Sequence, residues 1–175
     1  PIIENGGSDS AGFDNVLELL VVNKVLTLPQ AIMIMVPEAW KGTETDPAKA
    51  AFYKWAACLM EPWDGPAALA MTDGRWVCGG LDRNGLRPMR YVVTGDNLLI
   101  AGSEVGMVPV AESTVREKGA LGPGQMIAVD MREGRLYHDR EMKDRLAASQ
   151  PFGDWVEKVV QPGTMLENLP EPVTY

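Results

Sequence analysis

Three arginines and one aspartate are concentrated in a single stretch, Leu81 to Tyr91, which reads LDRNGLRPMRY. Guanidinium groups bind carboxylates and phosphates through paired N–H donors, so Arg83, Arg87 and Arg90 could together hold an anionic ligand. The alternative is an internal network, in which Asp82, Glu104 or another acid pairs with one of these arginines and fixes a bend. Because the sequence nearby has no surplus of basic residues, we favour the internal network.

A second segment with candidate chemistry is NGGSDS, from Asn5 to Ser10. Gly7 and the glycine before it allow a ligand to approach the backbone closely. Asp9 lies beside the predicted start of a helix, where a carboxylate stays ionised and could pair with the ammonium group of a substrate. Helix capping by Ser8, Asp9 or Ser10 is the simpler interpretation and is favoured by the residue types alone.

The composition excludes several classes of function. A net charge of −8 and a pI near 4.7 argue against a nucleic-acid partner, which would require a basic face. His138 is the single histidine, so a site with several histidine ligands is excluded and we expect no metal. No apolar stretch reaches the ~20 residues of a membrane span, so we expect no membrane partner and a cytoplasmic location. Cys58 and Cys78 lie in apolar runs, and we expect both to be buried, reduced thiols.

Apolar residues at helical spacing predict helices in the first third of the chain and near its end. Ser10 can cap the first helix, and Thr27 with Gln30 has the form of a capping box before the second. The predicted helices cover residues 12–24, 31–36, 46–60, 139–148 and 153–160.

Between these helices the pattern predicts three β-hairpins. The turns Asp73-Gly74 and Glu133-Gly134 are of the kind that joins two antiparallel strands directly. The paired strands are predicted over residues 67–72 with 75–81, 90–94 with 98–101, and 125–131 with 135–137. Hairpins build antiparallel sheets. Together with the flanking helices, they predict a layered α+β fold.

The two ends suggest a piece of a longer polypeptide. The sequence opens on Pro1 without an initiator methionine, and its last residues are rich in proline. We expect residues 1–160 to form part of one domain and residues 161–175 to be a linker toward the next domain.

Several motifs in order resemble the second half of the class-II glutamine amidotransferase domain of glutamate synthase large subunits. The resemblance extends over roughly residues 5 to 160, and its most specific part is Leu81–Tyr91 with the EPWDGP run before it. The motifs are GSDS (7–10), MVPEAW (35–40), MEPWDGPA (60–67), TDG (72–74), LDRNGLRPMRY (81–91), GSEVG (102–106) and PGQM (123–126).

The resemblance implies the αββα sandwich of the N-terminal nucleophile hydrolases. In that family a cysteine at the mature N-terminus, with its own α-amine as base, cleaves L-glutamine to glutamate and ammonia. Only one binding residue of the family matches this sequence: Asp9 stands at the position that holds the glutamine ammonium group, with Gly7 and Ser8 as candidate contacts. The nucleophile, the oxyanion-hole pair and the carboxylate-binding arginine would lie upstream, so we expect no catalytic residue here and no activity from this chain alone.

For the parent enzyme, the resemblance implies that ammonia passes to a synthase site that makes glutamate from 2-oxoglutarate. That chemistry uses FMN, iron–sulfur clusters, FAD and NADPH, none of them bound by this chain, and the partners are the rest of the large subunit and a small subunit. The residues Asp82, Arg83, Asn84, Gly85 and Arg87 then form a structural motif of the family. Two alternatives stay open: a non-catalytic scaffold or tunnel wall of the same fold, and an anion-binding module built on the three arginines.

Overall fold

The computed structural model describes residues 2–42 and 44–159 of the chain. The linker predicted over residues 161–175 lies outside the described residues. Within them, the helices are α1 (Asp9–Val22), α2 (Leu28–Met35), α3 (Pro47–Ala56), α4 (Asp139–Ala147) and α5 (Phe152–Glu157), with a 3-10 turn at Glu112–Thr114. The strands are β1 (Ala68–Thr72), β2 (Trp76–Leu81), β3 (Arg90–Thr94), β4 (Leu99–Gly102), β5 (Val115–Ala120), β6 (Met126–Asp130) and β7 (Arg135–Tyr137).

The strands form two antiparallel sheets. The first sheet has the order β1-β2-β6-β7, and the second sheet has the order β4-β3-β5. All three predicted hairpins are confirmed, as β1 with β2, β3 with β4, and β6 with β7. The pairing of β2 with β6 joins two of these hairpins into one sheet. The strand β5, which pairs with β3, was not predicted from the sequence.

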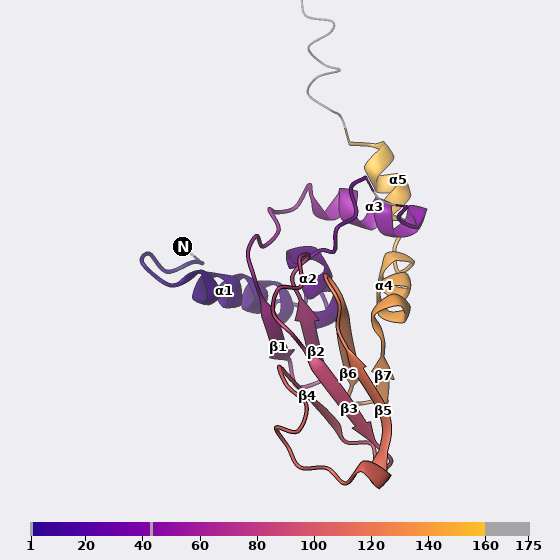
Figure 1. Cartoon of the computed structure of the whole chain (residues 1–175). Helices are drawn as coiled ribbons and strands as arrows, with labels where there is room; N and C mark the ends of the chain where they lie inside the picture. The colour runs from indigo at the N-terminus through magenta and orange to yellow at the C-terminus, as the bar shows by residue number, and fades with distance from the viewer. Residues whose placement is uncertain (1, 43, 160–175) are drawn as a thin grey trace, which may run out of the picture.

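The elements are stacked in layers, which confirms the α+β class (Figure 1). The helices α2 and α4 pack on one face of the first sheet. The main core lies between these helices and the sheet. The second sheet packs on the other face, where Ile127 of β6 meets Tyr91 and Val93 of β3. The run from Leu81 to Tyr91 therefore connects the two sheets, from the end of β2 to the start of β3.

Local side-chain hydrogen bonds explain where the helices begin. Ser8, and not Ser10 as predicted, caps α1: its hydroxyl accepts a hydrogen bond from the Ala11 N–H at 3.3 Å. The predicted capping box of α2 is present, because the Oε1 atom of Gln30 accepts from the Thr27 N–H at 3.1 Å. Each such bond satisfies an N–H that the first helical turn leaves without a partner.

The two cysteines differ, and the prediction was wrong for one of them. The helix α3 ends at Ala56, four residues before the predicted end, so Cys58 lies in the following turn and is exposed. Cys78 is buried in β2 as predicted, and burial raises the pKa of its thiol to about 12. Neither cysteine forms a disulfide. Among the described helices, none has the length and apolar character needed to span a membrane.

A hydrogen bond between His138 and Glu117 ties the two sheets together. His138 precedes α4 directly after β7, and its Nε2 atom lies 2.6 Å from the Oε1 atom of Glu117 in β5. The hydrogen bond from His138 is the main cause that lowers the pKa of Glu117. The hydroxyl of Tyr91 donates to the same oxygen at 2.9 Å. The pKa of Tyr91 is raised to about 12, chiefly by burial and then by this bond.

This contact predicts a pH-dependent contribution to stability. Because the pKa of Glu117 is lower in the folded chain, the contribution is present above its unfolded pKa of about 4.3 and is lost as pH falls through the folded value. We expect His138→Ala to lower the free energy of unfolding by less than about 1 kcal/mol near pH 5, since both side chains are partly exposed, and by a smaller amount near pH 3. Urea denaturation at both pH values measures the difference. Glu117→Gln should remove the pH dependence, and an equal effect of His138→Ala at both pH values would contradict this account.

Candidate functional site

The motif around Asp82 is a corner held by the backbone. Asp82 is 2% exposed, and its carboxylate accepts hydrogen bonds from the Ala67 N–H at 3.0 Å and the Asn84 N–H at 2.9 Å. Its main-chain carbonyl accepts from the N–H groups of Gly85 at 3.0 Å and Gly124 at 2.7 Å. The predicted internal ion pair is present, but the acid that pairs with an arginine is Asp64 with Arg83 and not Asp82, whose carboxylate is occupied by backbone donors. Asp82 therefore holds the corner together, and Asn84 contributes through its backbone N–H.

The three arginines of this stretch point to different places. Arg83 pairs with Asp64 at 2.8 Å, with 54% of the Arg83 side chain exposed. Arg87 lines a hollow beside α1, whereas Arg90 lines another hollow over the outer face of the second sheet. Neither Arg87 nor Arg90 has an ion pair with any described residue. The structure thus does not bring the three guanidinium groups together around one anion.

Two glycines let the motifs pack on one another. Gly85 has φ +59°, and a Cβ atom added to it would lie 2.7 Å from the Cα of Pro123. Gly124 has φ +67°, and a Cβ there would lie 2.8 Å from the Cα of Glu38. Three motifs that are far apart in the sequence therefore form one continuous contact: DRNG (82–85), GPG (122–124) and PEAW (37–40). The resemblance rests largely on motifs that meet at this place.

The close approach at Gly85 gives a direct test of the corner. We expect Gly85→Ala to destabilise the fold by about 3 kcal/mol, because the left-handed backbone and the clash with Pro123 both oppose a side chain. Gly134→Ala is the matched control: Gly134 has φ +60° but no atom within 4 Å of the added Cβ. Its free energy of unfolding should fall only by the cost of the left-handed backbone conformation, about 1 kcal/mol. Urea denaturation measures both variants, and equal losses would show that the contact with Pro123 contributes nothing.

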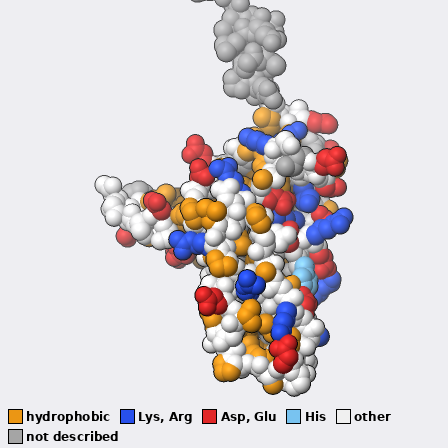
Figure 2. Space-filling view, in the orientation of Figure 1, with side chains coloured by type: hydrophobic (Ala, Val, Ile, Leu, Met, Phe, Trp, Pro, Cys, Tyr) orange, Lys and Arg blue, Asp and Glu red, His pale blue; other side chains and the backbone are white. Residues whose placement is uncertain are grey.

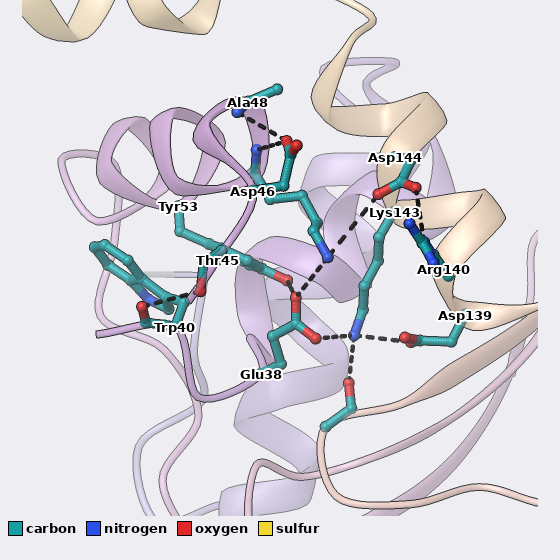
Figure 3. Close-up of polar contacts among 12 residues, drawn as sticks. Glu38, Trp40, Thr45, Asp46, Ala48, Tyr53, Asp139, Arg140, Lys143 and Asp144 are labelled. Carbon is teal, nitrogen blue, oxygen red and sulfur yellow. Dashed lines mark hydrogen bonds and ion pairs between the residues drawn. The ribbon is translucent and has the colours of Figure 1, made fainter. Parts of the chain in front are cut away.

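A buried lysine, which the sequence did not single out, fixes the same region (Figure 3). Lys143 of α4 is 2% exposed, and its ammonium group contacts Glu38 Oε2 at 2.9 Å, Asp139 Oδ1 at 2.8 Å and the Gly124 carbonyl at 2.7 Å. Tyr53 of α3 donates to the other oxygen of Glu38 at 3.0 Å. Burial and the charge of Glu38 raise the pKa of Tyr53, so its phenol stays protonated as the donor. The network joins α3, α4 and the loop after α2.

The signal for Lys143 was present in the helical spacing. In α4 the buried positions are Met142, Lys143, Leu146 and Ala147, which form one face of the helix. A lysine on the apolar face of a helix requires acidic partners. One of them, Asp139, lies one helical turn before Lys143 in α4 itself, but the other could not be identified from α4, because Glu38 lies 105 residues earlier in the chain.

Asp9 is the predicted site residue that the structure leaves free for chemistry. It is the first residue of α1 and is exposed, and Ser8 does the capping, so the Asp9 carboxylate is not used as a cap. Among the described residues it has no hydrogen-bond or ion-pair partner. Gly7 precedes the cap, and its N–H donates to the Glu4 carbonyl at 3.3 Å.

The surroundings of Asp9 are open. Its neighbours Ser8 and Ser10 line a hollow of about 580 Å³ together with Trp63, Arg87 and β1, but Asp9 is not among the lining residues. No group of three or more potential metal ligands occurs in the described part of the chain. A carboxylate in this position can bind a cationic group, but the described residues do not enclose a ligand around it.

Comparison with known proteins supports the family resemblance that these motifs indicate. The chain matches the family model of class-II glutamine amidotransferases over residues 1–155. It is 54% identical over 158 residues to the glutamate synthase [NADPH] large chain of Azospirillum brasilense, covering 90% of this chain and 10% of that protein. It is 52% identical over 161 residues to the glutamate synthase [NADH] of Saccharomyces cerevisiae, covering 92% of this chain and 8% of the relative. For the glutamate synthase [NADH] of Schizosaccharomyces pombe the identity is 47% over 173 residues, with 98% and 8% covered.

The chain thus spans about a tenth of the length of these relatives. The shared region includes the GSDS segment with Asp9, the corner at Asp82 and the helix that carries Lys143, all within the matched residues. The chain therefore belongs to the class-II glutamine amidotransferases, in the form found in glutamate synthases.

Proposed function

We propose that the chain is part of the glutaminase domain of a glutamate synthase, which hydrolyses L-glutamine to glutamate and ammonia. The observation that carries the proposal is Asp9, an exposed carboxylate at the N-terminus of α1 without a partner in the described chain. It would bind the α-ammonium group of glutamine through a charge-assisted hydrogen bond. Ser8 and Gly7 lie beside it and are candidate contacts to the same substrate.

The remaining catalytic groups belong to the upstream half of the domain. The nucleophile of this family is an N-terminal cysteine whose α-amine acts as base. Cys58 and Cys78 lie inside the chain and carry no free α-amine, and the pKa of Cys78 is raised by burial, which disfavours the reactive thiolate. We therefore propose that residues 1–160 bind one end of the substrate and that the chain alone is inactive.

In the parent enzyme the ammonia would pass to a second site, where 2-oxoglutarate becomes glutamate. We propose that FMN, iron–sulfur clusters and FAD serve that reaction outside this chain, in the rest of the large subunit and in a small subunit. NADPH is the proposed electron donor, although the relatives include proteins named for NADH, NADPH and ferredoxin. A cytoplasmic location stays a prediction, as do the linker at residues 161–175 and the fourth, helical layer of an αββα sandwich.

Ammonia release from glutamine by the full-length polypeptide tests the proposal. We expect glutamate and ammonia to form in equal amounts, and replacement of the N-terminal cysteine by alanine to abolish both. The control supplies free ammonia and 2-oxoglutarate, which should sustain glutamate synthesis in both proteins. If the wild-type polypeptide used free ammonia but released none from glutamine, the domain would be a scaffold or tunnel wall and the glutaminase proposal would be wrong.

A further inference from the structure

The first turns of α1, which carry Asp9, project from the body of the molecule. Figure 1 shows α1 extending sideways from the sheets, and of its 14 residues Leu17 alone is buried. Residues 9–11 are exposed, and Gly12 and Phe13 are half-buried. In Figure 2 this part of the helix forms an arm, and hydrophobic side chains lie where the arm meets the body. The place of Asp9 therefore depends on the contacts that hold these first turns.

One such contact joins two aromatic rings. Phe13 lies one helical turn after Asp9, so the two side chains are on the same face of α1. The ring of Phe13 meets the indole of Trp63 edge to face, with ring centroids 5.5 Å apart and an interplanar angle of 89°. This is a preferred geometry for an aromatic pair. Both rings line the hollow of about 580 Å³ that Ser8 and Ser10 also line, so the pair lies beside the segment that carries Asp9.

Trp63 is fixed at its backbone and at its indole. Its N–H donates to the carbonyl of Met35, the last residue of α2, at 2.7 Å. Its indole Nε1 donates to the carbonyl of Gly65 at 3.0 Å. The side chain is half-buried and packs against the main core. A ring that is both packed and hydrogen-bonded has little freedom to rotate, so the indole provides a fixed surface for Phe13.

The turn that carries Trp63 is joined to the corner at Asp82. Ala67, which follows the turn, donates its N–H to the Asp82 carboxylate at 3.0 Å. Asp64, the residue after Trp63, pairs with Arg83 of the same corner at 2.8 Å. The second link is an exposed ion pair, so the buried hydrogen bond to Asp82 is the stronger of the two. The corner, the turn and the first turns of α1 are therefore connected by direct contacts.

We propose that Trp63 is a positioning residue of the glutaminase reaction: through Phe13 it holds the first turn of α1 where the Asp9 carboxylate meets the ammonium group of glutamine. Trp63 itself makes no contact with the substrate in this role. A shift of about 1 Å in a group that binds the substrate can cost a factor of about 100 in rate, so a carboxylate on a projecting helix needs such a support. The corner at Asp82 then also serves the reaction, because it determines where the indole lies. This inference rests on the proposed function and adds a residue to it.

The kinetics of glutamine hydrolysis by the full-length polypeptide test this role. We expect Trp63→Ala to raise the KM for glutamine about tenfold and to change kcat less than about twofold, because the ammonium group is bound equally in substrate and transition state. Trp63→Phe keeps a ring against Phe13 and should restore most of the affinity for glutamine. Trp55→Ala is the matched control: it removes a half-buried indole of α3 that packs on Phe152 of α5, and it should leave KM within about twofold.

A double-mutant cycle separates positioning from a general effect on the fold. If Trp63 acts through Asp9, Trp63→Ala should raise KM less than about twofold once Asp9 is already asparagine, because the effects of coupled residues do not add. Phe13→Ala leaves the turn at Trp63 intact and should reproduce the rise in KM, so the test holds even where Trp63→Ala fails to fold. Additive effects of either variant with Asp9→Asn would show that the ring pair acts by another route and would overturn the proposal.

Hydrogen exchange of the same polypeptide reports on α1 without glutamine. We expect the amides of residues 13–17 to exchange at least about tenfold faster in Trp63→Ala and Phe13→Ala, with the α4 amides unchanged, because only the first turns of α1 lose their support. Unchanged exchange in α1 would overturn the proposal whatever the assay for ammonia shows. A wild-type polypeptide that releases no ammonia would overturn the proposed function and this inference with it. An unchanged KM in both variants of an active polypeptide would overturn this inference alone.

Discussion

Replacing Asp9 by asparagine in the full-length polypeptide is expected to raise the KM for glutamine on the order of 100-fold. The reason is that Asp9 is exposed and has no partner among the described residues, so its carboxylate would bind the substrate ammonium group instead of holding the fold together. We expect the bound substrate to be enclosed only in the complete domain, where removing one partner of the charge pair costs about 2–5 kcal/mol, and each 1.4 kcal/mol is a factor of ten in affinity. Asparagine keeps the shape of the side chain and loses only the charge.

The effect should fall on KM more than on kcat, because the ammonium group is distant from the bond that is cleaved and is bound equally in substrate and transition state. Glutamate synthesis from free ammonia should be unchanged, since that reaction bypasses glutamine. Asp14→Asn is the matched control: it removes an exposed carboxylate from the same helix and should leave KM within about twofold. If Asp9→Asn left kcat/KM unchanged, the ammonium-binding role would be wrong.

The parts of the fold that were predicted correctly depend on local signals. The Asp73-Gly74 and Glu133-Gly134 turns determine their hairpins within a few residues, and the Gln30 capping box acts within one helical turn. The strand β5 was missed because VREKGA has no apolar run. It forms because it pairs with β3, where Gly119 leaves room for the ring of Tyr91: a Cβ there would come far inside contact distance of the ring.

In the candidate site, too, local features were predicted correctly and features that depend on distant residues were not. The predicted pairing of an acid with one of the arginines is met by Arg83 and Asp64, whereas Asp82 fixes the corner through backbone N–H groups, which no count of charged residues reveals. The exposure of Cys58 depended on where α3 ends, and an apolar context does not determine that end. Asp9 was identified from a short motif, for which helix capping was the simpler interpretation. In the structure Ser8 is the cap of α1, so Asp9 does not have that role.

Replacing Lys143 by methionine is expected to destabilise the domain by about 3 kcal/mol. Methionine matches the length of the lysine stem but leaves the carboxylates of Glu38 and Asp139 without the ammonium group between them, and removing one member of a buried ion pair costs about 3–5 kcal/mol. We take the lower end of this range because these two side chains are 21% and 20% exposed and can recover some hydration. The loss of the bond to the Gly124 carbonyl adds to the effect, since that loop packs against the Asp82 corner.

Lys49→Met is the matched control, because Lys49 approaches the same Glu38, and also Asp144 of α4, but each only at 3.9 Å, with 19% of its side chain exposed. A pair at that distance contributes less than about 1 kcal/mol. Hydrogen exchange of the α4 amides in the two variants separates them: Lys143→Met should speed exchange about 100-fold, as expected for a loss near 3 kcal/mol, and Lys49→Met less than about fivefold. Equal effects would show that the general charge around Glu38, and not the buried position of Lys143, holds α4 against the GPG loop.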